Sequence, residues 1–182
     1  MNYNDLLSAR KHFDTIAELC DTIERGNWWD KPESCSITLR EIFQHDVANF
    51  IMYLSASDGR LSAEEVQAYR VITGFGGDNF DTIKRHIEED NIYSMDFESE
   101  PPTIMKLLSK AERKAILFGV NFESSILKSI AVFYEMVGEI IISIDGGISY
   151  KEKRDFSIIM DTINGFAADH DIIGNRWSLF GD

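Results

Sequence analysis

Cysteine and proline are scarce in this 182-residue sequence, which contains two of the first and three of the second. Cys20 and Cys35 are too few for a disulfide scaffold and fit a reduced cytosol. No apolar run reaches the roughly 18 residues that a membrane span needs. The opening residues are polar and acidic, unlike a signal peptide. We therefore expect a cytoplasmic protein, and the small number of prolines favours helices.

Basic residues are also in short supply: 18 Lys and Arg stand against 31 Asp and Glu, a net charge of −13. Nucleic acids and anionic membranes are bound through basic surfaces, so we expect neither as a partner. The charge instead favours a cationic partner such as a basic protein.

Familiar catalytic and metal-binding motifs are missing. The sequence has no C-x-x-C and no H-E-x-x-H, and its four histidines are scattered. The glycines at 74, 76 and 77 lack the G-K-[S/T] of a phosphate-binding loop and are interpreted as a helix stop. Carboxylates are too numerous for any pair to stand out as an acid and base. We therefore expect a protein that is not an enzyme; an α-helical hydrolase is an alternative that rests on carboxylates alone.

The most informative feature present is a turn that occurs twice. Residues 58–65 and 145–152 both read D-G-x-[L/I]-S-x-x-E, and the offset between them is 145 − 58 = 87 residues. Glycine after a helix end tolerates positive φ. The serine then caps the next helix, and the glutamate three residues later completes a capping box. The pattern predicts two equivalent helix–turn–helix corners.

The same turns match only the second half of an EF-hand calcium loop. The residues at loop positions 1 and 3 would be Leu54 and Ala56 in one copy, and Ile141 and Ser143 in the other. These residues cannot supply the six to eight oxygen ligands that calcium takes, so a working EF-hand is not expected.

The stretches 51–72 and 138–160, which contain the two turns, resemble the tellurite-resistance TerB-like family. The resemblance implies an all-α bundle with acidic patches and, for some members, divalent-metal binding. No cofactor is otherwise indicated, so weak calcium or magnesium binding is the only candidate. The second copy has Lys151 where the first has Glu64. The metal ligands that the resemblance implies are Asp58, Glu64, Glu65, Asp145 and Glu152.

Apolar residues recur at helical spacing along most of the chain. The β-branched segment 138–147 could be a strand, but its continuity with 123–137 favours helix. We predict one all-α domain over 1–182, a bundle of about seven helices with repeat units at about 38–75 and 123–168. The core pair would be the helices near 40–57 and 123–144. The expected helices span 4–24, Thr38 (boxed with Glu41) to about Ser57, Ser62 to about Thr73, about 80–89, Thr103 to about Phe118 with a possible restart at Ser109, 123–144, and Ser149 to about Ala168.

An acidic stretch at 88–102 contains no basic residue and ends in two prolines. It predicts either a solvated loop or a docking surface for a basic partner, with one aromatic residue as an anchor. The adjacent tryptophans at 28 and 29 are either half-buried lids or interface anchors. The candidate partner-binding residues are Glu88, Glu89, Asp90, Asp96, Phe97, Glu98, Glu100, Trp28 and Trp29.

These observations predict a non-enzymatic, cytosolic, TerB-like binding module that acts through acidic surfaces on a protein partner or a divalent cation. The alternative is an acidic immunity protein that binds and inhibits a basic toxin such as a nuclease. The sequence carries no signal for an oligomeric state.

Overall fold

The computed structural model describes residues 3–32, 36–57, 59, 61–77, 81–83, 85, 96–144 and 150–173. Within these ranges all regular structure is helical and no strand occurs, which confirms the all-α prediction, including helix rather than strand at 138–143. The six helices with defined bounds are α1 (Tyr3–Arg25), α2 (Leu39–Ala56), α3 (Ala63–Thr73), α5 (Thr103–Leu117), α6 (Ile126–Ser143) and α7 (Tyr150–Asp169). Of the helix expected at about 80–89, only 81–83 and 85 are described, and they are helical.

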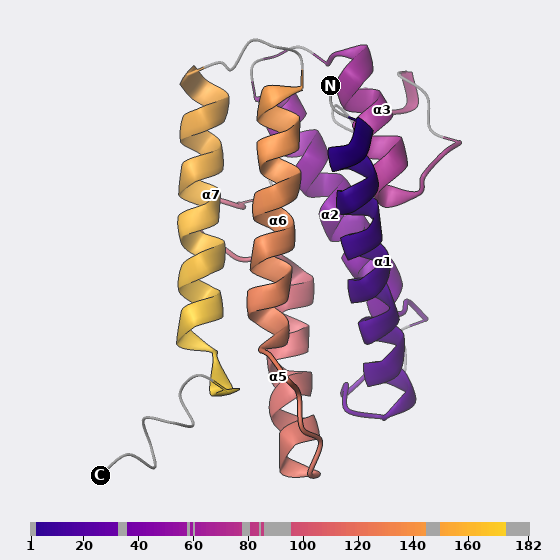
Figure 1. The fold of residues 1–182 in the computed structure, drawn as a ribbon, viewed down its shortest axis with the longest axis vertical. Coiled ribbons are helices and arrows are strands. Elements are labelled where there is room, and N and C mark those ends of the chain that lie inside the picture. Colours follow the sequence, from indigo (N-terminus) through magenta and orange to yellow (C-terminus); the bar gives the residue numbers. More distant parts are fainter. Residues whose placement is uncertain are drawn as a thin grey trace.

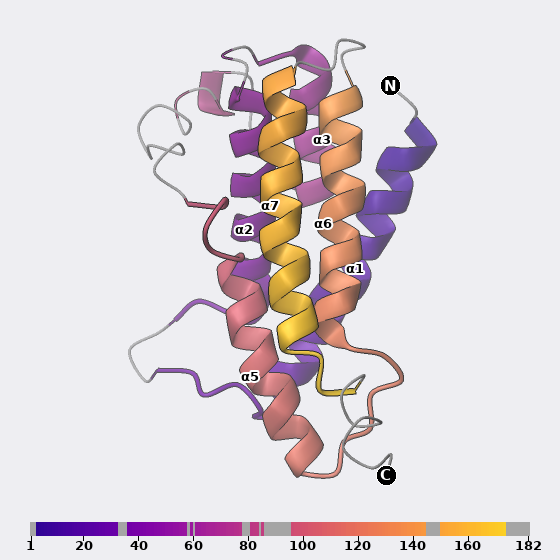
Figure 2. The same ribbon diagram turned by 90° about the vertical axis from the view of Figure 1, so that its left-hand side faces the viewer.

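The centre of the bundle is built from α1, α2 and α6, which pack against one another. α3 lies against α1 and α2, α5 against α2 and α6, and α7 against α6 and part of α2 (Figure 1 and Figure 2). The predicted core pair of α2 and α6 is therefore in contact. The stripe of apolar residues along α1 makes this helix a third central member, because its whole length from Leu6 to Ile23 is buried on one side.

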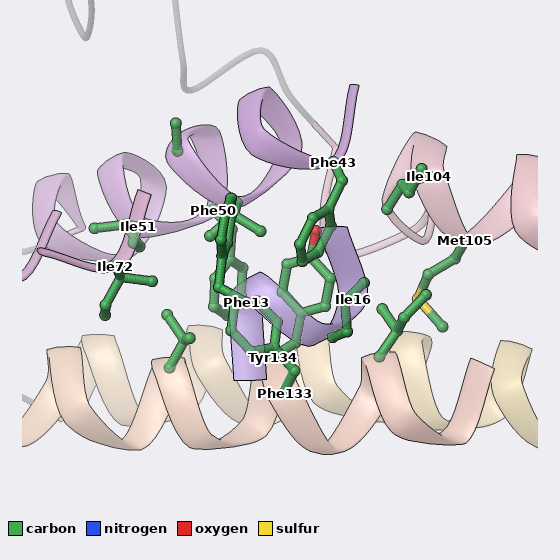
Figure 3. Packing of buried hydrophobic residues seen from close by; sticks show 14 of the residues in the cluster. Phe13, Ile16, Phe43, Phe50, Ile51, Ile72, Ile104, Met105, Phe133 and Tyr134 are labelled. Atoms are coloured by element: carbon green, nitrogen blue, oxygen red, sulfur yellow. The ribbon is translucent and has the colours of Figure 1, made fainter. Parts of the chain in front are cut away.

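Aromatic rings join the three central helices (Figure 3). Phe13 of α1 stacks on Phe43 of α2 with 4.9 Å between ring centroids, and Phe133 of α6 lies 5.5 Å from Phe43. Phe50 of α2 meets Tyr134 of α6 edge to face at 5.0 Å. Edge-to-face and offset arrangements are those that the ring quadrupole favours.

Two of the predicted helix starts are present with their full capping boxes. Ser62 Oγ accepts from the backbone N–H of Glu65, whose carboxylate accepts from the backbone N–H of Ser62. Thr38 and Glu41 make the same reciprocal pair at α2. Gly59 has φ +80°, the left-handed conformation expected of the repeated turn.

Two other helix starts differ from the prediction. Thr103, where the sequence places the helix start, is the first residue of α5 and does not cap it: Pro102 is the N-cap, and Asp46 of α2 supplies the acceptor, with Ile104 N donating to Asp46 Oδ2 at 2.7 Å. The helix does not restart at Ser109, since α5 continues through it to Leu117. Glu112, three residues after Ser109, does not cap a new helix: it is fully buried and accepts from Ile126 N at 3.0 Å, at the start of α6.

The ends of α2 and α7 that border the two repeated turns lie close together. Lys151 Nζ at the start of α7 donates to the carbonyl oxygen of Ser57 at 2.5 Å. The bundle therefore brings the borders of both turns to one end (Figure 1). The predicted N-cap Ser149 and the second Asp-Gly pair lie outside the described residues.

α6 and α7 approach closely at Gly138. A Cβ built on this glycine would lie 2.0 Å from Cε2 of Phe156 in α7. The ring therefore packs directly on the α6 backbone, at a site that only glycine leaves open. None of the described helices has the length and apolar character that crossing a membrane requires.

Candidate functional site

The described end of the acidic stretch, residues 96–102, is docked on the bundle. Phe97 is buried and packs edge to face on Phe50 and Tyr53 of α2, at 6.2 and 5.5 Å. Thr162 of α7 donates its hydroxyl to the carbonyl oxygen of Glu98 at 2.5 Å. This segment therefore lies against α2 and α7 (Figure 2), and its carboxylates are carried on a fixed backbone.

A cavity of about 200 Å³ lies between this segment, α2 and the first turns of α5. We call it the α2–α5 pocket. Its lining is largely polar on the α2 side, while prolines and the Phe97 ring supply apolar surface. The lining residues are Asp46, Asn49, Asp96, Phe97, Glu100, Lys106 and the range 101–103.

Asp46 is the electrostatic centre of the pocket. Its carboxylate accepts from the N-terminal N–H groups of α5, and it is the group that caps this helix. Burial raises the pKa of Asp46 to about 6, because removal from water penalises the charged form more than the bonds from α5 and the charge of Lys106 stabilise it. A carboxylate that is costly to ionise and lines a cavity is typical of a functional group.

The rest of the pocket is biased toward negative charge. Asp96 and Glu100 are exposed at its edge, and Lys106 pairs with Glu100. Three carboxylates thus face one ammonium group around this cavity. Lys106 demonstrates that an alkylammonium group is compatible with the site.

Further carboxylates lie near the hydroxyl of Tyr53 in α2. The hydroxyl of Tyr53 donates to Glu98 Oε1 at 3.3 Å. Burial raises the pKa of Tyr53 to about 12, and the charges of Glu98, Asp155 and Asp96 add to this rise. The carboxylates therefore lie near one another on the α2–α7 side of the bundle. We define the acidic patch as Asp46, Asp96, Glu98, Glu100 and Asp155.

The metal ligands implied by resemblance do not come together in the part of the chain that is described. Glu64 is exposed, the Glu65 carboxylate is used in the capping box, and Glu152 is buried. Asp58 and Asp145 lie outside the described residues. Among the described side chains, no group of three or more His, Cys, Asp or Glu is arranged to hold a metal ion.

The predicted partner-binding residues are divided. Asp96, Glu98 and Glu100 are brought together in the acidic patch, whereas Glu88, Glu89 and Asp90 lie outside the described residues. The aromatic candidates differ from the interface-anchor interpretation. Phe97 and Trp29 are buried in the core cluster and Trp28 is half-buried against it, so these rings stabilise the fold. Burying the apolar surface of these rings in the core is more favourable than exposing it to water.

Among the charged and amide side chains that line the pocket, three were missed from the sequence: Asp46, Asn49 and Lys106. Asp46 and Asn49 belong to α2, which also carries Arg40, Glu41, Gln44 and His45, so these two residues give no distinct local signal. Their role depends on α5 arriving beside them, with 58 residues separating Asp46 from Ile104. Nothing in the local pattern indicates that approach.

The other cavity and the cysteine thiols offer weaker support for a functional site. A larger groove of about 370 Å³ runs between α1 and α6, with the carboxylates of Asp5 and Glu139 at its rim. It contains none of the residues that the sequence predicts to bind a metal or a partner. Cys20 is buried and its pKa is raised to about 12 by that burial, so the thiol is inert. Cys35 lies outside the described residues.

Comparisons with protein-family models, with curated proteins and with solved structures found no match for this chain. The resemblance to the TerB-like family therefore stays a prediction from two short motifs.

Proposed function

We propose that this protein is a non-catalytic binding module whose acidic patch pairs with a basic protein. The proposal rests on one observation: three carboxylates of the patch, Asp46, Asp96 and Glu100, line a cavity, and the segment 96–102 is fixed against α2 and α7. A fixed surface loses little conformational entropy when a partner binds, which favours affinity. The net charge of −13 would also accelerate encounter with a cationic partner.

A divalent cation is a weaker candidate for the ligand. The metal interpretation depends on the repeated turns, where the carboxylate of Glu65 is used in a cap and Glu152 is buried, which leaves Glu64 as the exposed candidate among the described residues. Magnesium and calcium require several oxygen ligands around one point. A protein is therefore favoured over a divalent cation as the partner.

An inhibitor of a basic toxin is the second candidate, and it would use the same patch. The observation that favours it is the fixed backbone under the carboxylates, because rigid complementary surfaces are found in tight inhibitory complexes. It differs from a general binding module in the partner: a toxin would lose its activity when bound, whereas a scaffold partner would keep it.

The test measures association with an arginine- and lysine-rich peptide by surface plasmon resonance, at about 20 mM and about 150 mM salt. Asp96→Asn, Glu98→Gln and Glu100→Gln are combined in one variant. The matched control neutralises Asp5, Glu135 and Glu139, three carboxylates of the α1–α6 region. We expect the patch variant to slow association about tenfold at the lower salt concentration, and the control to slow it much less. Equal losses in both variants would show that net charge alone attracts the peptide and would refute the patch as the site.

A further inference from the structure

We propose that the C-terminal end of α5 is a second docking surface, which binds an acidic amphipathic helix of a partner protein. We call this surface the basic tip and define it as Lys110, Arg113, Lys114, Leu117 and Phe118. Its charge is opposite to that of the acidic patch, so the two surfaces would bind different partners. The inference goes beyond the proposed function and does not depend on it.

α5 carries an excess of positive charge in an otherwise acidic chain. It has four basic residues and one acidic residue, Glu112, which is fully buried. Each of the other five helices with defined bounds has more acidic than basic residues. The helix dipole attracts cations within the last turn, where Lys114 lies, so it does not account for Lys110 and Arg113. These two side chains are exposed and have no ion-pair partner among the described residues, so their charges are available to a ligand.

Two large apolar side chains are exposed directly after these cations. The exposed fraction is 86% for Leu117 and 74% for Phe118, and Ile116 and Val120 beside them are only half-buried. At this point α5 extends past the start of α6 and the end of α7, so the tip projects from the bundle (Figure 1 and Figure 2). Contiguous apolar surface that is exposed to water marks an interaction site.

The backbone under the apolar pair is held by a complete helix ending. Gly119 has φ +85° and donates its N–H to the carbonyl oxygen of Ile116 at 3.0 Å, while Val120 N donates to that of Ala115 at 3.0 Å. These are the two hydrogen bonds of a Schellman motif, which a left-handed glycine permits. The apolar pair is therefore displayed on a fixed backbone, and binding through it costs less conformational entropy than binding through a flexible loop.

The spacing of the tip residues favours a helix as the occupant. Lys110, Arg113 and Leu117 follow one another at steps of three or four residues, and so do Lys110, Lys114 and Phe118, which places all five on one face of α5. A second helix laid along this face can present carboxylates at the same spacing opposite the cations. Its apolar residues would then cover the exposed pair, as in other helix–helix contacts with charged flanks.

An anionic membrane fits the tip less well than an acidic helix. Lys114 is already paired with Asp30 at 2.5 Å, and Glu123 is exposed just after the tip. Anionic bilayers are recognised by clusters of roughly four to eight basic residues. Only Lys110 and Arg113 remain uncompensated here, and two cations match a row of carboxylates on one helix.

The probe is a fluorescein-labelled synthetic peptide in which glutamate and leucine recur at helical spacing. Its binding to the full chain is measured by fluorescence anisotropy at about 150 mM salt, where charges more than about 8 Å apart are largely screened. A peptide with glutamine in place of glutamate is the matched ligand and should bind about fivefold more weakly. Phe118→Gln should weaken binding of the acidic peptide about tenfold, as expected for loss of one buried ring. Lys110→Gln combined with Arg113→Gln should weaken it about fivefold.

Two control variants change the same residue types elsewhere on the surface. Val132→Gln replaces an exposed apolar residue of α6, and Lys11→Gln combined with Lys153→Gln removes exposed cations from α1 and α7. Neither control should change binding of the acidic peptide. Because every substituted side chain is exposed, all variants should keep the circular dichroism of the parent.

Several results would overturn the inference. The first is an acidic peptide that does not bind, or that binds the tip variants and the controls equally well. Preferential binding to vesicles of phosphatidylcholine and phosphatidylserine, lost in Phe118→Gln, would assign the tip to a membrane instead. Self-association in sedimentation that Phe118→Gln removes would assign it to a second copy of this chain. The acidic and the basic peptide test different surfaces, so either proposal can fail while the other stands.

Discussion

Replacing Asp46 by asparagine should stabilise this protein at neutral pH. The pKa of Asp46 is raised from 3.8 to about 6 in the folded state. The folded protein thus holds this proton more tightly than the unfolded chain, so Asp46 contributes stability below pH 3.8 that is lost as pH rises through about 6. A shift of about two pKa units corresponds to about 3 kcal/mol of cost at pH 7.

The net gain from Asp46→Asn is smaller than that cost. Asparagine keeps a side-chain oxygen for the N–H of Ile104, but its amide NH₂ is a new buried donor, and leaving it without a partner costs about 1 kcal/mol. We therefore expect the variant to be about 1–2 kcal/mol more stable than the parent at pH 7. The stability difference between the two proteins should shrink by about 2 kcal/mol, to near zero or below, between pH 7 and pH 4.

The assay is urea unfolding followed by circular dichroism at pH 4, 5, 6 and 7, with free energies from linear extrapolation. Asp161→Asn is the matched control, because Asp161 is an exposed carboxylate on α7, and its stability difference should stay within about 0.5 kcal/mol of zero. If the Asp46→Asn variant is less stable than the parent at pH 7 and has the same pH dependence, then ionisation of Asp46 does not destabilise the folded protein and the reasoning is refuted.

Further substitutions test the packing and the caps. Gly138→Ala should lower stability by about 2 kcal/mol or more, because the new Cβ meets a ring of α7 at 2.0 Å. Gly165→Ala, with open space around the glycine, should raise stability by about 0.5–1 kcal/mol. If chemical denaturation ranks the two variants the other way, the close approach of α6 and α7 is contradicted. Tyr134→Phe keeps the ring and removes a buried hydroxyl that has no hydrogen-bond partner among the described residues. Thermal unfolding of this variant should therefore occur at the same or a higher temperature. A loss of stability above about 1 kcal/mol would reveal a hydrogen bond to that hydroxyl. Ser62→Ala removes the cap of α3 and should lower stability by about 1 kcal/mol. Ser125→Ala changes an N-cap that makes no side-chain hydrogen bond, so it should leave stability unchanged. Comparable losses of stability in the two variants would contradict the assigned caps.

How far the sequence predicted the site depended on whether its residues belong to one segment. The acidic stretch marked Asp96, Glu98 and Glu100 correctly as neighbours, since short separations along the chain keep them close. The same reasoning could not tell that Phe97 turns into the core, because the direction of that ring depends on Phe50 and Tyr53 of a distant helix. Asp46 was missed for the same reason.

The sequence by itself determined the helical class and the starts of α2 and α3, because apolar periodicity and capping boxes act between residues three or four positions apart. The tertiary structure alone decided how α5 and α6 begin: Asp46 and Glu112 supply acceptors from 58 and 14 residues away. It also decided that a charged group would line a cavity, since burial and its effect on the pKa of Asp46 exist only once α2, α5 and residues 96–102 have packed together.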